Sequence, residues 1–228
     1  MSKTGSFLIR YGISTLGLVI AALGVGLSIK SNLGIAPLSC VPTVLSLQFT
    51  RWSVGTFTWI FNISFILLQA ILLRKKFKWE HAIQVIPVLI FGYLIDGAIW
   101  LFNALDAPSS HYFVQIILCL AAVLLTAVGI RIEVVGKGWL LPIDSTLNVL
   151  SGMTGGKFST IKVILDVVLV AVTAVLALVF FGLLTGNGST VVIREGTVIQ
   201  AILTGLCMKV TDPLVDRVFG RVVAKVTS

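Results

Sequence analysis

Two prolines, each followed two residues later by a polar side chain, mark the stretches of this sequence that could bind a solute. Pro37 precedes Ser39 in "PLSC", and Pro142 precedes Asp144 in "PIDS". Proline suits the first turn of a helix because its missing N–H would have no partner there. A helix that begins inside a membrane presents free N–H groups and the positive end of its dipole. We therefore expect two short helices whose N-termini face a polar or anionic solute.

Polar side chains also fall in the middle of two apolar stretches. Asn62 and Asp166 occupy corresponding places in "VGTFTWIFN" and "FSTIKVILD". A charge at the bilayer centre costs at least about 2.5 kcal/mol, so such residues are functional or tightly paired. Asp166, together with Asp144, is the expected group for coupling to protons or sodium. Lys162 could pair with Asp166 as a structural bridge or belong to the cytoplasmic interface, and Asp144 could instead cap its helix.

Charged residues recur on the last apolar stretch of each half of the chain. One alignment of these stretches places Asp96 opposite Lys209, and another places it opposite Asp212. The sequence leaves both alignments open. In the first, Asp96 and Lys209 could form an ion pair near the axis that relates the halves.

The composition is that of an integral membrane protein. Of the 228 residues, 57% are hydrophobic and 11% charged, and the mean hydropathy is +1.07. Such a chain forms a bundle of membrane-spanning helices, so we expect one transmembrane domain over residues 1–228. The net charge of +8 comes from basic groups beside apolar runs, which indicates a lipid interface and not nucleic acid.

Enzyme chemistry has no support in the sequence. No HExxH or Ser/His/Asp set is present, and the three cysteines lack CxxC spacing, so we expect no catalysis, cofactor, metal site or disulfide.

The two halves of the chain are related to each other. Placing Pro37 over Pro142 superimposes residues 22–46 on residues 127–151 without a gap, with identities that include Gly24/Gly129 and Ser46/Ser151. Many membrane transporters are built from such duplicated halves. We expect repeats over about 8–104 and 112–218.

The distribution of Lys and Arg predicts the topology. Basic groups share one side of the membrane, as the positive-inside rule requires, only if each half has three crossings and one segment that enters and leaves on the same face. The expected fold is therefore all-α, with six transmembrane helices and two re-entrant half-helices in two inverted repeats. The helices are expected near 8–30, 54–73, 80–103, 112–132, 158–184 and 196–217, and the re-entrant segments near 31–50 and 136–154. Both termini would be cytoplasmic.

Four short stretches of the chain carry a resemblance: "GVGLSIKSNLGIAP", "VGTFTW", "LLPIDSTLNVLS" and "GTVIQAILTG". Through them the chain resembles the YczE/YyaS/YitT-like family of small bacterial integral membrane proteins. Members often carry Asp at the second position after the proline in both halves, where this chain has Asp144 but Ser39. The resemblance implies a multi-pass plasma-membrane protein and no particular substrate.

These features favour a permease for a small polar or anionic solute that binds near the bilayer midplane. One alternative is a solute-capturing subunit, or a regulatory membrane protein, that needs a partner. Another is a passive channel, since two half-helices meeting at the midplane also suit a selectivity constriction. The small-residue face in "GLVIAALGVG" permits a homodimer.

Overall fold

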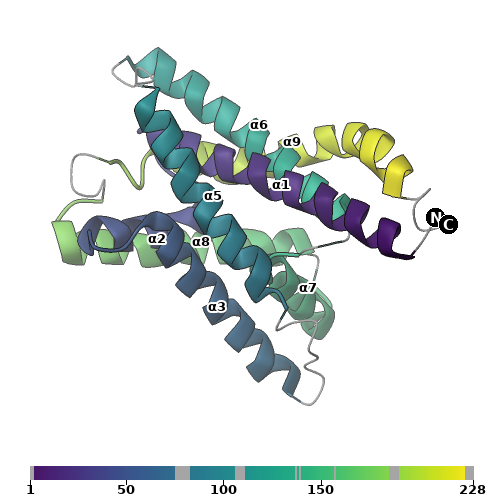
Figure 1. The fold of residues 1–228 in the computed structure, drawn as a ribbon. Coiled ribbons are helices and arrows are strands. Elements are labelled where there is room, and N and C mark those ends of the chain that lie inside the picture. The colour runs from purple at the N-terminus through teal and green to yellow at the C-terminus, as the bar shows by residue number, and fades with distance from the viewer. Residues whose placement is uncertain are drawn as a thin grey trace.

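The described part of the chain is helical throughout. The structure, a computed structural model, describes residues 3–74, 83–105, 111–136, 138, 140–156, 158–184 and 190–223, and no strand occurs among them. Eight α-helices and a closing π-helical turn follow one another along these residues (Figure 1). They are α1 (Lys3–Ser31), α2 (Pro37–Gln48), α3 (Val54–Leu73), α5 (Val85–Ala104), α6 (Tyr112–Gly136), α7 (Pro142–Thr154), α8 (Phe158–Phe181), α9 (Glu195–Val215) and η2 (Asp216–Gly220).

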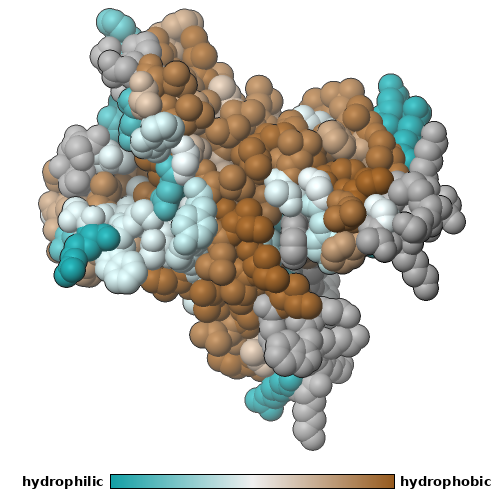
Figure 2. All heavy atoms as spheres, in the orientation of Figure 1, coloured by the Kyte–Doolittle hydropathy of each residue, from teal (hydrophilic) through white to brown (hydrophobic). Residues whose placement is uncertain are grey.

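Six of these helices are long and apolar enough to cross a membrane: α1, α3, α5, α6, α8 and α9. Their outer faces expose large apolar side chains, as Val163, Val167 and Val179 of α8 illustrate. Figure 2 shows that apolar atoms cover most of the visible face, while hydrophilic ones gather towards the ends. Water disfavours so much exposed apolar surface, whereas lipid accommodates it. The predicted all-α, multi-pass membrane protein is confirmed at this level.

The short helices begin where the prolines predict. Pro37 and Pro142 open α2 and α7, which have 12 and 13 residues. Helix ends were less predictable. α8 stops at Phe181 instead of residue 184, because Gly182 takes a left-handed conformation with φ of 69°. α6 continues to Gly136, four residues past its predicted end, and α5 begins at Val85, after predicted residues that partly lie outside the described ranges.

α1 and α6 pack closely through glycines, and the contacts repeat in the two halves. The alignment of the halves pairs Gly17 with Ala122, Ala21 with Thr126, and Gly24 with Gly129. A Cβ on Gly24 would lie 2.8 Å from Thr126 N and 3.0 Å from Ala122 O. A Cβ on Gly129 would lie 2.8 Å from both Ala21 Cα and Gly17 O. The two glycines therefore make the same close contact with exchanged partners.

The packing of the other helices follows the same pattern. α1 packs against α5 as α6 packs against α9, and α2 contacts α8 as α3 contacts α7. One pair departs from this pattern. α3 packs along α5, whereas the described residues of α8 and α9 make little or no contact with each other.

Candidate functional site

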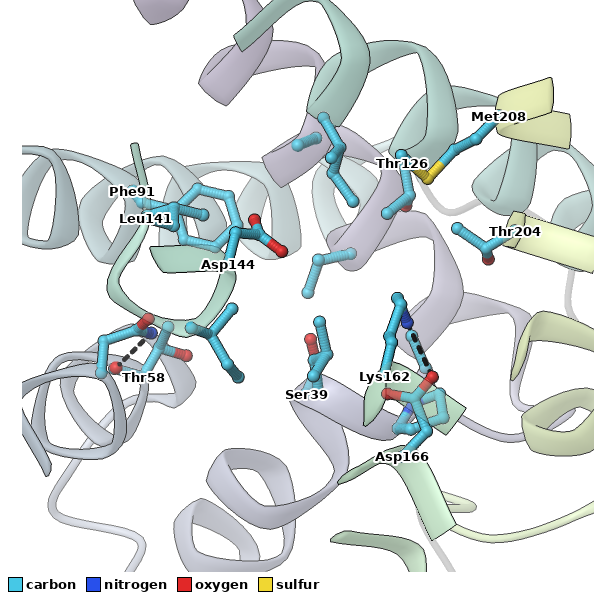
Figure 3. A pocket seen from close by; sticks show the side chains of 18 of the residues that line it. Ser39, Thr58, Phe91, Thr126, Leu141, Asp144, Lys162, Asp166, Thr204 and Met208 are labelled. Carbon is cyan, nitrogen blue, oxygen red and sulfur yellow. Dashed lines mark hydrogen bonds and ion pairs between the residues drawn. The ribbon is translucent and has the colours of Figure 1, made fainter. Parts of the chain in front are cut away.

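A central cavity of about 640 Å³ brings the predicted site together (Figure 3). All eight α-helices contribute residues to its wall. A volume of this size is typical of small-molecule sites, which are mostly apolar with a few placed polar groups. Of the predicted solute-binding residues, Pro142 does not line it; those that do are Pro37, Ser39, Asn62, Asp144 and Asp166.

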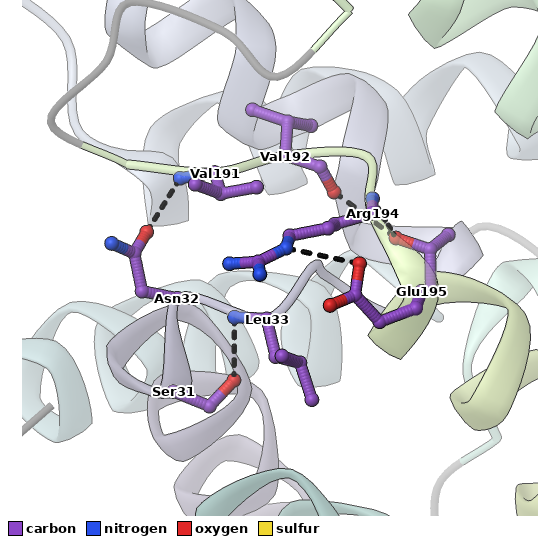
Figure 4. Close-up of polar contacts among 8 residues, drawn as sticks. Ser31, Asn32, Leu33, Val191, Val192, Arg194 and Glu195 are labelled. Atoms are coloured by element: carbon purple, nitrogen blue, oxygen red, sulfur yellow. Dashed lines mark hydrogen bonds and ion pairs between the residues drawn. The ribbon is translucent and has the colours of Figure 1, made fainter. Parts of the chain in front are cut away.

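The segment before α9 holds the start of α2 in place (Figure 4). The Ile35 N–H donates to Val192 O over 3.0 Å, and the Val191 N–H donates to Asn32 Oδ1 over 2.7 Å. The chain reaches these positions through Gly34, whose φ of 117° suits a residue without Cβ. The turn that leads into α2 is therefore fixed by the second half of the chain.

The start of α7 is held by two fully buried polar residues that sequence reasoning missed. The Leu141 N–H donates to Glu133 Oε1 over 2.9 Å. Gln69 Nε2 donates to Pro142 O over 2.9 Å, and Ser145 Oγ donates to Gln69 Oε1 over 3.2 Å. Both Glu133 and Gln69 are 0% exposed. A charged residue inside an apolar helix is the signal that could have found Glu133, but the helix was predicted to end one residue earlier.

Asp144 faces the cavity and does not cap its own helix. No side-chain hydrogen bond caps α7, and within the described residues the Asp144 carboxylate has no hydrogen bond or ion pair. Figure 3 shows the carboxylate directed into the open centre that Ser39, Lys162 and Asp166 also border. Among the described residues, Asp144 therefore makes no capping hydrogen bond.

Asp166 and Lys162 form an ion pair in the cavity wall. Lys162 Nζ lies 2.7 Å from Asp166 Oδ2, and the side chains are 23% and 7% exposed. Of the two predicted roles of Lys162, the structure therefore shows the ion pair with Asp166, one helical turn away. The second oxygen, Asp166 Oδ1, is buried without a hydrogen-bond partner among the described residues.

The side-chain amide of Asn62 is also buried, and its oxygen accepts no hydrogen bond from the described residues. Its Nδ2 donates to Thr58 O over 2.9 Å, which fixes the amide orientation because a carbonyl can only accept. Asn62 is 5% exposed, and within the described structure its Oδ1 has no hydrogen-bond partner. The amide therefore offers an acceptor and has already used a donor.

The helix N-termini supply fewer free donors than expected. The N–H groups of Ser39 and Cys40 both donate to Ala36 O, over 2.9 and 3.1 Å, and Pro37 has none. At α7, Asp144 places its own negative charge in the first turn, where it interacts favourably with the positive end of the dipole.

Asp96, a residue of α5, lies outside the cavity and contacts the start of α3. Its two oxygens accept hydrogen bonds from Ser53 Oγ over 2.6 Å and Gly55 N over 2.8 Å. The side chains of Lys209 and Asp212 are outside the described part of the structure. The predicted pairing of Asp96 with either of them stays a prediction.

A second cavity of about 270 Å³ lies further along the same helices. On α2, Ser39 lines the large cavity, while Thr43 and Ser46 line the small one. On α5, Phe91 lines the large cavity and Ile99 the small one. Three residues of the helices that both cavities share, Val25, Thr43 and Ile95, are 5%, 1% and 0% exposed.

Comparisons with known proteins agree with the resemblance seen in the sequence. The family described as "Family of unknown function (DUF6198)" matches residues 8–213. The "Uncharacterized protein YyaS" of Bacillus subtilis (strain 168) is 26% identical over 210 residues, covering 92% of this chain and 94% of that protein. No solved structure matches the chain. The predicted similarity to YyaS-like proteins is confirmed.

Proposed function

Because the chain belongs to the family of unknown function DUF6198, whose description names no activity, we propose a function from the central cavity. The protein is a permease of the bacterial plasma membrane for a small polar solute. The solute binds in the cavity near the bilayer midplane, between the first turns of α2 and α7.

The observation that carries this proposal is the meeting of Ser39 and Asp144 in one cavity. They hold corresponding places on α2 and α7, two short helices from different halves of the chain. At 1.5 Å per residue, helices of 12 and 13 residues are about 18 and 20 Å long, too short for a hydrocarbon core of about 30 Å. We assign both as re-entrant half-helices that begin near the midplane, as in other transporters.

The exchanged glycine contacts support an inverted repeat. Gly24 and Gly129 make equivalent contacts across α1 and α6, and the pairing of the remaining helices repeats with the halves exchanged. Three crossings per half place the halves in opposite orientations. The beginning of α1 and the end of η2 lie at the same end of the molecule (Figure 1), as six crossings require. We assign this end to the cytoplasm from the positive-inside rule.

The departure from symmetry supports alternating access. α3 and α5 are packed together, whereas α8 and α9 make little or no contact through the residues that the structure describes. The large cavity has residues of both α8 and α9 in its wall. In a repeat protein, exchanging these two arrangements closes one side and opens the other. The small cavity, beside Val54 and Ile99, lies where the second opening would form.

Two carboxylates are the candidates for coupling to protons or sodium. Asp144 and Asp166 both line the cavity, and ionisable groups within a membrane commonly form proton relays and ion pathways. Their placement beside the solute would let ion and solute binding influence each other.

The test is uptake by the purified protein alone. A thermal-shift screen first identifies stabilising solutes, since a ligand at a hundred times its Kd stabilises by about 2.7 kcal/mol. The radiolabelled hit is then offered to proteoliposomes that contain wild type, Asp144→Asn or Glu195→Gln. Glu195 is an exposed surface carboxylate and serves as the control for loss of charge.

A permease gives saturable uptake that Asp144→Asn reduces and Glu195→Gln preserves. A hit that binds but never enters the vesicles would contradict the permease and favour a solute-capturing subunit. Uptake that does not saturate would favour a passive channel.

A further inference from the structure

The polar atoms of the large cavity are unequally satisfied. Four nitrogen-bearing side chains of its wall each already donate to a protein acceptor: Lys162 Nζ to Asp166, Asn62 Nδ2 to Thr58 O, Gln200 Nε2 to Gly34 O, and Arg131 Nη2 to Asp216. The backbone N–H groups of Ser39 and Cys40 are used as well. These donors are oriented by protein acceptors, and they serve an anionic solute only through the N–H hydrogens that remain.

The acceptors of the same cavity are left over. Asn62 Oδ1 and Asp166 Oδ1 are buried without partners, and the Asp144 carboxylate has neither a hydrogen bond nor an ion pair, all within the described residues. Asn62 and Asp166 are both 5% exposed. A buried polar atom without a hydrogen bond costs free energy, so these atoms indicate a group that donates to them.

The charges of the cavity wall point in the same direction. Four ionisable side chains line it, namely Arg131, Asp144, Lys162 and Asp166. Arg131 is paired with Asp216 and Lys162 with Asp166. Asp144 makes no ion pair within 4.0 Å among the described residues, and it shares the positive charge of Lys162 with Asp166. A charge in a poorly solvated site is stable only when it is neutralised.

We propose that the solute carries a cationic group with several N–H donors, a primary ammonium or a guanidinium, which binds Asp144 and donates to Asn62 and Asp166. The inference rests on the proposed function and specifies its substrate class. The rest of the wall is largely apolar, with Phe61, Phe91 and Met208 among its residues, and it suits a short hydrocarbon portion of the same solute.

The test is a series of ligands that share one butyl chain, measured by thermal shift on the purified protein in detergent. Butylamine and butylguanidine are the N–H-bearing cations. N-butylurea is the neutral counterpart of the guanidine, pentanoate is the anion, and butyltrimethylammonium is a cation without N–H. The ranking is read on the wild type, so it does not depend on any variant being folded.

The expected result is saturable stabilisation by butylamine or butylguanidine, with the other three at least tenfold weaker. Asp144→Asn, which keeps the shape of the side chain, should weaken the cation at least tenfold, and Glu195→Gln should leave it unchanged.

Three results would overturn the inference while leaving a permease in place. Pentanoate could bind best, butyltrimethylammonium could bind as well as butylamine, or Asp144→Asn could keep the affinity for the cation. Stabilisation by sodium or protons alone, with no response to any of the five compounds, would also overturn it and identify Asp144 as an ion site only. Failure of every small solute to bind would contradict the proposed function itself.

Discussion

Replacing Lys162 with methionine should destabilise the protein strongly, because it removes the partner of a buried charge. Lys162 Nζ lies 2.7 Å from Asp166 Oδ2, and Asp166 is only 7% exposed in its side chain. Its second oxygen has no hydrogen-bond partner among the described residues. Lys162→Met would therefore remove the hydrogen bond to Oδ2 as well, and the buried carboxylate would keep no hydrogen bond from the described residues.

The expected magnitude follows from the burial of the pair. Removing one partner of a buried ion pair costs about 3–5 kcal/mol, whereas replacing both partners is often close to neutral. Asp166→Asn should cost less than Lys162→Met, because Lys162 is 23% exposed and its long side chain can reach water. The double variant Lys162→Met/Asp166→Asn should recover most of the loss.

The assay is thermal unfolding of the purified variants in detergent. With roughly 2–4 °C of Tm per kcal/mol for a chain of this length, Lys162→Met should lower Tm by about 6 °C or more. The control is the surface pair of Arg194 and Glu195, with Nε–Oε2 of 2.9 Å and exposures of 36% and 41%, where such bridges contribute about 0–1 kcal/mol. Small and additive effects at both pairs would refute the reasoning that Asp166 is buried in the cavity wall.

Three further predictions concern the frame of the cavity. Single cysteines at Lys30 and Thr50, which flank α2, should react with a membrane-impermeant maleimide from the same side; reaction from opposite sides would show that α2 crosses the membrane. Gly129→Leu should destabilise the folded protein by about 1–3 kcal/mol, because the larger side chain overpacks the contact with α1. Gly97→Leu is the control and should be tolerated, because a Cβ at Gly97 meets nothing within 4 Å. Equal thermal stability of the two variants would contradict the close packing of α1 and α6. Glu133→Ala should cost about 1–3 kcal/mol by leaving the N–H of the α7 N-cap unbonded, and Glu133→Gln should retain more stability in the same unfolding assay because it keeps an acceptor.

The sequence predicted the helix starts better than the helix ends. Pro37 and Pro142 occupy the first turn because proline fits there and hardly anywhere else in a helix. No comparable signal marks the end of α6, which continues to Gly136. That error hid Glu133, whose role depends on meeting Leu141 N across the turn into α7.

The sequence predicted several residues of the cavity wall but not the hydrogen bonds that their atoms make. Composition and spacing singled out Asn62, Asp144 and Asp166, and all three line the cavity. Which of their atoms are satisfied depends on neighbours that only the fold supplies, such as Thr58 O for Asn62. The expectation of a polar or anionic solute between two helix N-termini could not take into account that Ala36 O already accepts the N–H groups of Ser39 and Cys40.

The most direct test of a transport path is the side from which each cavity can be reached. Single cysteines at Thr204, in the large cavity, and Asn103, in the small one, would be placed in a chain whose three native cysteines are replaced by alanine. Right-side-out and inverted vesicles would then be treated with a membrane-impermeant maleimide. A permease predicts that the two positions react from opposite sides, and that a bound solute changes both rates in opposite directions. Reaction of both positions from the same side would contradict a path across the membrane.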